Sequence, residues 1–171
     1  RTTTAGKPDS PPPEGSFVDD ITMARFLRRS RPAGMTLEGH HVRLESLSFD
    51  HLDDLCAVGL DESLWQWVPT AVRNREEMRV YIEAALDEQQ RGVSLPFATV
   101  SKATGEVVGS TRFANMDLNG RRVEIGWTGI GAPWQRTAVS TEGKYLMLTH
   151  AFEALKCVRV ELKTDTLNTR S

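Results

Sequence analysis

Small and hydroxyl-bearing side chains gather in one short stretch of the chain, at Thr137, Ala138, Ser140 and Thr141. The stretch follows a break in pattern at residues 129–133 and precedes apolar residues at a helical spacing. The first turn of a helix leaves several backbone N–H groups without partners and carries the positive end of the helix dipole. We therefore predict that this stretch binds a phosphate group.

The elements predicted on either side of this stretch would position its phosphate-binding residues. Residues 121–130 alternate apolar and polar side chains, the period-2 pattern of a half-buried strand. Apolar residues then recur at three and four positions and predict one helix over residues 135–155. Because residues 157–163 alternate again, strand, helix and strand should form one β-α-β crossover with parallel strands.

Earlier segments predict two helices and three further strands. Ser48 or Asp50 can cap a first helix, and Asn74 opens a second helix that should end at Gly92. The predicted strands cover residues 41–47, 94–101 and 106–115, the last two joined by a hairpin turn. Asn119-Gly120 makes another turn into the strand at 121–130, so an antiparallel meander should result. The fold class is therefore α/β (α+β), with a mixed, mainly antiparallel sheet flanked by helices.

Length and composition limit the classes of partner. The 171 residues are enough for one domain, which we place at 35–171. Residues 1–34 are rich in proline and polar residues, and we expect a disordered or weakly helical extension. A formal charge of −2 argues against a nucleic-acid partner. Neither cysteine shows metal-ligand spacing, so no metal is expected.

The chain has neither an apolar run of about 20 residues nor a signal peptide at its start. We therefore expect no membrane contact and a cytoplasmic location.

Two further groups of residues have alternative interpretations. Trp65 and Trp67 can serve as core packing or as one wall of a substrate cleft. Ser110, Thr111 and Arg112 can face an acceptor cleft or lie on the surface of the sheet. The sequence leaves both alternatives open.

The order of elements resembles the GNAT superfamily of acyl-CoA-dependent N-acetyltransferases. In that family a Q/R-x-x-G-x-G/A signature lies between the central strand and the next helix, and residues 135–140 (Q-R-T-A-V-S) occupy its position. Residues 124–127, 133–135 and 141–142 resemble more particularly the ribosomal-protein-alanine acetyltransferase branch. Ala138 stands where glycine is usual and Ser140 where glycine or alanine is usual, and the methyl group at 138 narrows the approach of a pyrophosphate.

The resemblance implies a GNAT-like fold, acetyl-CoA as cosubstrate and a set of contacts with it. Backbone N–H groups of the signature would hold the pyrophosphate, with Arg136 as a nearby cation. The end of the central strand would bind the pantetheine arm, and Asn168 matches an asparagine that contacts the cofactor. The implied cofactor-binding residues are Trp127, Thr128, Ile130, Gln135, Arg136, Thr137, Ala138, Val139, Ser140, Thr141 and Asn168.

The resemblance also implies transfer of an acetyl group to a primary amine by direct attack. An ammonium group must lose a proton before it attacks, so a carboxylate is the expected general base. Glu124 is our candidate; its alternative role is a solvated ion pair with Arg112 or Arg122. Ser171 matches a serine that would protonate the departing thiolate. A backbone N–H near Trp127 or Thr128 would hold the oxyanion.

Several questions stay open at this point. The acceptor can be a protein N-terminus or a small-molecule amine, and the chain can act as a monomer or as a homodimer. A non-catalytic acyl-CoA-binding module is the alternative function. The family pattern continues past Ser171 with a further helix and strands, so we expect the domain to be incomplete at its C-terminus.

Overall fold

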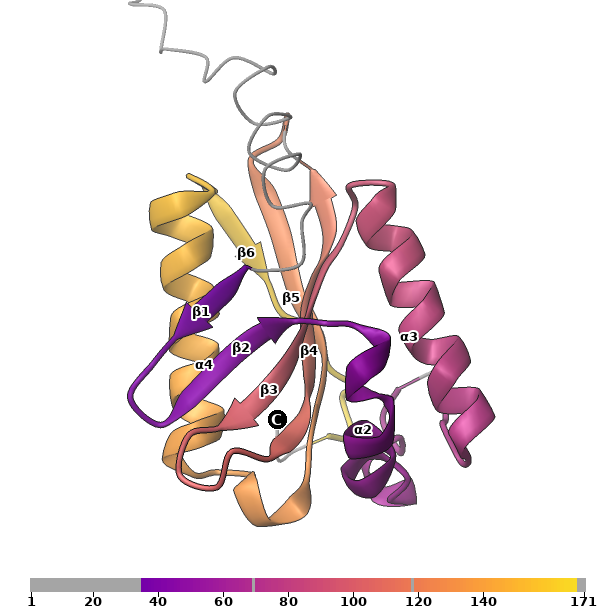
Figure 1. The fold of residues 1–171 in the computed structure, drawn as a ribbon. Coiled ribbons are helices and arrows are strands. Elements are labelled where there is room, and N and C mark those ends of the chain that lie inside the picture. Colours follow the sequence, from indigo (N-terminus) through magenta and orange to yellow (C-terminus); the bar gives the residue numbers. More distant parts are fainter. Residues whose placement is uncertain (1–34, 69, 118, 169–171) are drawn as a thin grey trace, which may run out of the picture.

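A computed structural model describes residues 35–68, 70–117 and 119–168 of the protein. Its centre is a six-stranded sheet in the order β1-β2-β3-β4-β5-β6 (Figure 1). Neighbouring strands are antiparallel except β5 and β6, which are parallel. The strands are β1 (Thr36–Glu38), β2 (Val42–Ser46), β3 (Leu95–Ser101), β4 (Val107–Asp117), β5 (Arg122–Ile130) and β6 (Arg159–Glu161). The predicted fold class is thus confirmed, including the parallel pair joined by a helical crossover.

Helices cover both faces of this sheet. In Figure 1, α4 lies to the left of the sheet, and α2 and α3 lie to its right. The longer helices are α2 (Leu52–Gly59), α3 (Arg75–Gln90) and α4 (Ala138–Thr149). Short helical turns are η1 (Phe49–His51), η2 (Glu62–Leu64), η3 (Ala132–Trp134) and the π-helical turn η4 (His150–Ala154), which continues α4.

The capping residues act as their types predict. The Ser48 side chain accepts a hydrogen bond from the N–H of Asp50 at the start of η1. The Asn74 side chain accepts one from the N–H of Glu77, at 2.9 Å, and opens α3. Gly92 follows the end of α3 with a φ of 76°, a conformation that favours glycine.

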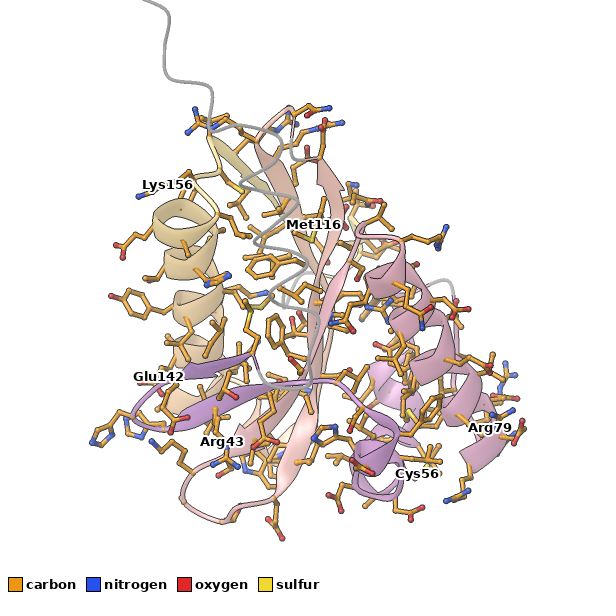
Figure 2. All side chains as sticks on the ribbon, turned by 45° about the horizontal axis from the view of Figure 1, so that its top comes forward. Arg43, Cys56, Arg79, Met116, Glu142 and Lys156 are labelled. Atoms are coloured by element: carbon orange, nitrogen blue, oxygen red, sulfur yellow. The ribbon has the colours of Figure 1, made fainter. Side chains whose placement is uncertain are left out.

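Two apolar clusters fill the space on either side of the sheet. Beneath α4, Phe97 and Phe113 meet edge to face with their ring centroids 6.2 Å apart, beside Met147. Beneath α2 and α3, Tyr81 and Ile82 pack against the other side of the strands. Figure 2 shows Met116 inside the fold and Arg79 on the outer face of α3. Both clusters pack against β4 and β5, and these two strands carry the site described below.

Three elements differ from the sequence predictions: one strand was not predicted, and one helix and one strand have other boundaries. The strand β1 was not predicted, because three residues are too few for a period-2 pattern. The helix predicted from residue 135 begins at Ala138, since Arg136 has a left-handed φ of 60°. The strand predicted over 157–163 is limited to Arg159–Glu161.

The predicted extension at residues 1–34 lies outside the described residues. In the part of the chain that is described, no helix is both long enough and apolar enough to cross a membrane.

Candidate functional site

The parallel strands β5 and β6 pair over a short length only. Their register joins Arg122 to Arg159, Val123 to Val160 and Glu124 to Glu161. Among the described residues no strand pairs with residues 126–130 of β5 on that side. The edge of the strand is therefore available to an extended ligand with amide groups of its own.

The helix α4 begins next to this open edge, and its first turn has no side-chain cap. The Thr137 side chain accepts no hydrogen bond from the helix, and its hydroxyl donates to the Trp134 carbonyl at 2.7 Å. The hydroxyl of Ser140 donates to the Thr137 carbonyl at 3.0 Å. Neither hydroxyl occupies the N–H groups of the first turn, which keep the capacity to bind an anion.

A groove with a volume of about 570 Å³ connects the strand edge to the start of the helix. It brings together residues that are far apart in the sequence, including Trp67 after η2 and Asn168 after β6. Six predicted cofactor-binding residues line it: Thr128, Ile130, Gln135, Arg136, Ser140 and Asn168. The remaining five, Trp127, Thr137, Ala138, Val139 and Thr141, are not among its lining residues, and Ser171 lies outside the described residues.

One of the lining residues also has a structural role. The side-chain amide of Gln135 donates to the carbonyl of Ile130 at 2.9 Å, which ties the end of β5 to the loop before α4. Arg136 is exposed in the same loop, so its guanidinium can reach an anion in the groove.

A β-bulge in β5 decides which way Trp127 points. Arg112 pairs with Gly126 and Ser110 with Gly129, so Trp127 and Thr128 together oppose Thr111. Trp127 has a left-handed φ of 53°. Simple alternation predicts Trp127 on the face of Ile125, and that prediction was wrong: its ring lies with the α2 and α3 cluster.

Trp127 forms part of a mainly apolar pocket between β5 and the segment that joins α2 to α3. Trp65 and Tyr81 form another wall, with their ring centroids 5.5 Å apart and nearly perpendicular. The indole N–H of Trp65 donates to the Gly59 carbonyl at 2.6 Å. Leu64, Thr128 and Gly129 line both this pocket and the groove, so the two lie next to each other. The sequence left two roles for the tryptophans, core packing or one wall of a cleft. Trp65 lines the apolar pocket, and Trp67 lines the groove.

Arg112 packs against two of the aromatic side chains that line this pocket, Tyr81 and Trp127. Its side chain is only 4% exposed and pairs with Glu88 at 3.1 Å. Its guanidinium carbon lies 5.0 Å from the ring centroid of Tyr81 and 4.7 Å from that of Trp127. Ser110 lines the pocket, whereas Thr111 on the opposite face bonds Thr128 at 2.8 Å. The three consecutive residues therefore take different roles, which their sequence did not reveal.

Glu124 lies on β5 two residues before Gly126, and its side chain is 11% exposed. One carboxylate oxygen, Oε2, accepts from Asn115 at 2.8 Å and from Lys163 at 2.5 Å. These partners replace the predicted Arg112 and Arg122. The other oxygen, Oε1, would be 3.2 Å from a Cβ atom at Gly126, so it points along β5 toward the bulge.

The surroundings of Glu124 keep it ionised. Burial raises the pKa of its carboxyl group, but hydrogen bonds from Lys163 and Asn115 and the charge of Lys163 bring it below the ordinary value. Glu124 lines a cavity of about 250 Å³ with Asn115 and Lys163, and it is not among the lining residues of the groove.

Sequence reasoning missed the part of the pocket that comes from α2, where Leu55 and Val58 lie. These residues read as ordinary core positions, and nothing in their spacing distinguishes them. Within the described residues, no group of three or more His, Cys, Asp or Glu side chains is placed to hold a metal ion.

Comparison with known families agrees with this geometry. Residues 41–171 match the family described as the acetyltransferase (GNAT) domain, which is more than half of the chain. The protein belongs to this family.

Individual relatives extend the comparison. The chain is 25% identical over 137 residues to the uncharacterized N-acetyltransferase p20 of Bacillus licheniformis, covering 80% of this chain and 76% of that protein. A crystal structure of a GCN5-related N-acetyltransferase from Brucella melitensis is 28% identical, with a TM-score of 0.71 over 81% of this chain and 65% of that one. The ribosomal L7/L12 alpha-N-protein acetyltransferase RimL, solved with coenzyme A, has the same fold at 17% identity, with a TM-score of 0.70 over 80% and 78% of the chains.

Proposed function

We propose that this protein transfers an acetyl group from acetyl-CoA to a primary amine by direct attack, without a covalent enzyme intermediate. One observation carries the proposal: a single groove joins the start of α4, which has no side-chain cap, to the end of β5, where no described strand pairs on the side of β6. A strand edge suits the amides of a pantetheine arm, and a helix start suits a pyrophosphate. Coenzyme A has both groups in this order.

The residues present fit such a cosubstrate. The N–H groups of Ala138, Val139 and Ser140 in the first turn of α4, with Thr137 before them, would hold the pyrophosphate, and Arg136 would add a positive charge. The N–H of Thr141 donates to the Thr137 carbonyl at 3.1 Å, so Thr141 could contribute only its hydroxyl. Ala138 is exposed at the start of α4, so its methyl group would meet the bound pyrophosphate and leave it less room than glycine would. Thr128 and Ile130 would bind the pantetheine amides through their backbone, with Trp127 at the acetyl end, and Asn168, which lines the same groove, would contact the cofactor. When bound, acetyl-CoA supplies the activated acetyl group.

Glu124 is the proposed general base. Its oxygen Oε2 accepts hydrogen bonds from Asn115 and Lys163. The other oxygen, Oε1, has no hydrogen bond among the described residues and faces Gly126. An acceptor ammonium near Gly126 could give its proton to Oε1 directly or through one water molecule. A backbone N–H at the bulge would hold the oxyanion. Ser171 stays the proposed acid for the thiolate.

The apolar pocket beside the groove is the proposed place for the acceptor. Its aromatic walls suit the apolar part of an amine, which can be a protein N-terminus or a small molecule. Membership of the ribosomal-protein-alanine acetyltransferase branch is the more specific proposal, and it favours a protein N-terminus. A homodimer and a cytoplasmic location stay predictions from the sequence.

The experiment measures release of CoA thiol from acetyl-CoA with panels of peptides and small amines. Arg136→Met should weaken CoA binding about tenfold and reduce its salt dependence, because one charge-assisted contact is lost. Lys102→Met is the control, since Lys102 pairs with Glu38 on the surface. Tight CoA binding without acetyl transfer to any amine would contradict the proposal.

A non-catalytic acyl-CoA-binding module is the second candidate. The hydrogen bonds that lower the pKa of Glu124 make it a weaker base, which favours this alternative. Glu124→Gln separates the two functions. An enzyme loses turnover and retains CoA binding, whereas a binding module has no turnover to lose.

A further inference from the structure

Lys163 places a primary ammonium group of the protein itself against the proposed general base. Its Nζ lies 2.5 Å from Oε2 of Glu124. The lysine belongs to the exposed segment that follows β6, and its side chain is 63% exposed, whereas that of Glu124 is 11% exposed. The ammonium group therefore reaches a nearly buried carboxylate from the surface of the protein.

This contact distinguishes Lys163 from the other lysines of the described chain. Among them, Lys163 is the one whose ammonium group contacts Glu124. Lys102 is also paired with a glutamate, Glu38, at 2.7 Å. It lines neither the groove nor the cavity around Glu124, so it represents a similar ion pair away from the site.

The cavity of about 250 Å³ around Glu124 gives the lysine room to move. One water molecule needs about 10–15 Å³, so this cavity also has room for an acetyl group. The second carboxylate oxygen, Oε1, faces Gly126, which precedes Trp127 at the proposed acetyl end of the groove. The four-carbon side chain of Lys163 is flexible, so its amine can pass from Oε2 to Oε1 without a change in the backbone.

We propose that Lys163 is a self-acetylation site, to which the protein transfers an acetyl group from acetyl-CoA bound in its own groove. The inference rests on the proposed function, because it requires acetyl-CoA in the groove and Glu124 as the base. An amine that Glu124 deprotonates must lie within hydrogen-bond reach of its carboxylate, and Lys163 meets this condition before any external amine binds. Because the amine is part of the chain, no second molecule has to be brought to the site.

The reaction has the same balance as transfer to an external amine. The nitrogen Nζ forms a bond to the acetyl carbon, and the C–S bond of the thioester breaks with its electron pair on sulfur. Of the two protons that the ammonium group loses, one passes to Glu124 and then to solvent, and the other ends on the CoA thiol. The products are one acetyl-lysine and one molecule of CoA.

The modification would change the base beside it. A hydrogen bond to Glu124 and the charge of that carboxylate raise the pKa of Lys163, so the reaction should be faster at higher pH. Acetylation removes the positive charge of the lysine. Since that charge and its hydrogen bond help to lower the pKa of Glu124, self-acetylation should raise the pKa of the base.

The test incubates the full chain with acetyl-CoA and no amine acceptor, and follows each lysine by peptide mass spectrometry. Lys163 should be acetylated at least about 100-fold faster than Lys102, because general-base catalysis contributes about this much. The rate per chain should not change on dilution, since base and amine belong to one chain. Glu124→Gln should reduce the rate at Lys163 to that at Lys102. Lys163→Arg, which keeps a cation beside Glu124, should abolish the fast reaction.

Desulfo-CoA provides a control with the wild type that decides the question if Glu124→Gln does not fold. It occupies the groove without an acetyl group, so it should slow the reaction at Lys163 and leave that at Lys102 unchanged. Equal rates at the two lysines would mean chemical acetylation only, and a rate per chain that rises with protein concentration would mean transfer between chains. Either result would overturn the inference.

A parallel assay with the panel of peptides and small amines separates this inference from the proposed function. Transfer to an external amine while Lys163 stays unmodified would overturn self-acetylation alone. Tight CoA binding without transfer to any amine, Lys163 included, would overturn both.

Discussion

The guanidinium group of Arg112 lies over the indole ring of Trp127, at 4.7 Å from its centroid. The contact crosses from β4 to the bulge of β5, where Trp127 adopts its left-handed conformation. A non-glycine residue in this conformation needs support from its surroundings, and Arg112 provides it through the indole face. The same arginine is fixed by Glu88, so the pocket wall is tied to α3.

We expect Arg112→Met to destabilise the protein by about 2–3 kcal/mol, because it removes the cation–π contacts and leaves Glu88 without its partner. Urea unfolding measures this change. Arg79→Met is the control: Arg79 pairs with Glu76 on the exposed side of α3, and its loss should cost about 0.5 kcal/mol or less. Equal effects of the two substitutions would show that Arg112 does not support the bulge.

Lys163→Met should change the pH dependence of acetyl transfer if Glu124 is the base. The lysine helps to lower the pKa of Glu124, so its removal raises that pKa. The wild-type rate should fall only in acid, below the ordinary range of a glutamate, and the variant should lose activity at a higher pH. The measurement is kcat/KM against pH for both proteins.

Two outcomes distinguish this role from a structural one. An unchanged pH profile in Lys163→Met, with activity retained in Glu124→Gln, would exclude Glu124 as the base. Arg159→Met serves as the control, because Arg159 pairs with Glu161 on the same strand and does not contact Glu124. It should leave the pH profile as it is in the wild type.

Local patterns were sufficient to predict most elements of the fold. The Asn74 cap and the Gly92 stop fix the ends of α3 through interactions within a few residues. The alternation in β5 and the helical spacing after it gave the parallel crossover. Six residues predicted to bind the cofactor line one groove. Five of them belong to β5, α4 or the loop between the two, because a strand and the helix that follows it lie next to each other in any such unit.

Features that depend on contacts between distant segments were not predictable from these patterns. The bulge at Trp127 reverses the face that alternation assigns, and its cause is the pairing with β4. The sequence left Arg112 either facing an acceptor cleft or on the surface of the sheet, yet Tyr81 and Glu88 of α3 pack against it and its side chain is buried. The partners of Glu124 come from β4 and from beyond β6. No short window of sequence contains both members of these pairs.

Glu142 of α4 should make the stability of the protein depend on pH. Its carboxylate accepts hydrogen bonds from the backbone N–H groups of His40, His41 and Val42, at 2.8, 2.6 and 3.0 Å. Figure 2 shows it beside the turn that joins β1 and β2. Burial raises the pKa of Glu142, but the three backbone bonds bring it below the ordinary value.

A lowered pKa means that the folded state favours the ionised form. This stabilisation is present above the pKa of an unfolded glutamate, about 4.3, and is lost as the pH falls through the folded value. Glu142→Gln should therefore destabilise the protein by about 1 kcal/mol at neutral pH and by less in acid. Urea unfolding at several pH values tests this, with the exposed Glu153→Gln as the control. A difference between wild type and Glu142→Gln that does not vary with pH would contradict the role of the ionised carboxylate.

Gly109 and Gly129 should respond in opposite ways to an added methyl group. A Cβ atom at Gly109 would lie 2.0 Å from the carbonyl oxygen of Gly129, so β4 and β5 would have to separate beside the bulge. Gly109→Ala should cost at least about 3 kcal/mol, measured by urea unfolding.

A Cβ atom at Gly129 meets no atom within 4 Å, so Gly129→Ala should fold normally and place its methyl group beside the groove and the pocket. We expect that methyl group to weaken CoA binding while the stability stays within about 0.5 kcal/mol of the wild type. Stable Gly109→Ala protein, or Gly129→Ala protein that fails to fold, would show that the two strands do not approach each other in this way.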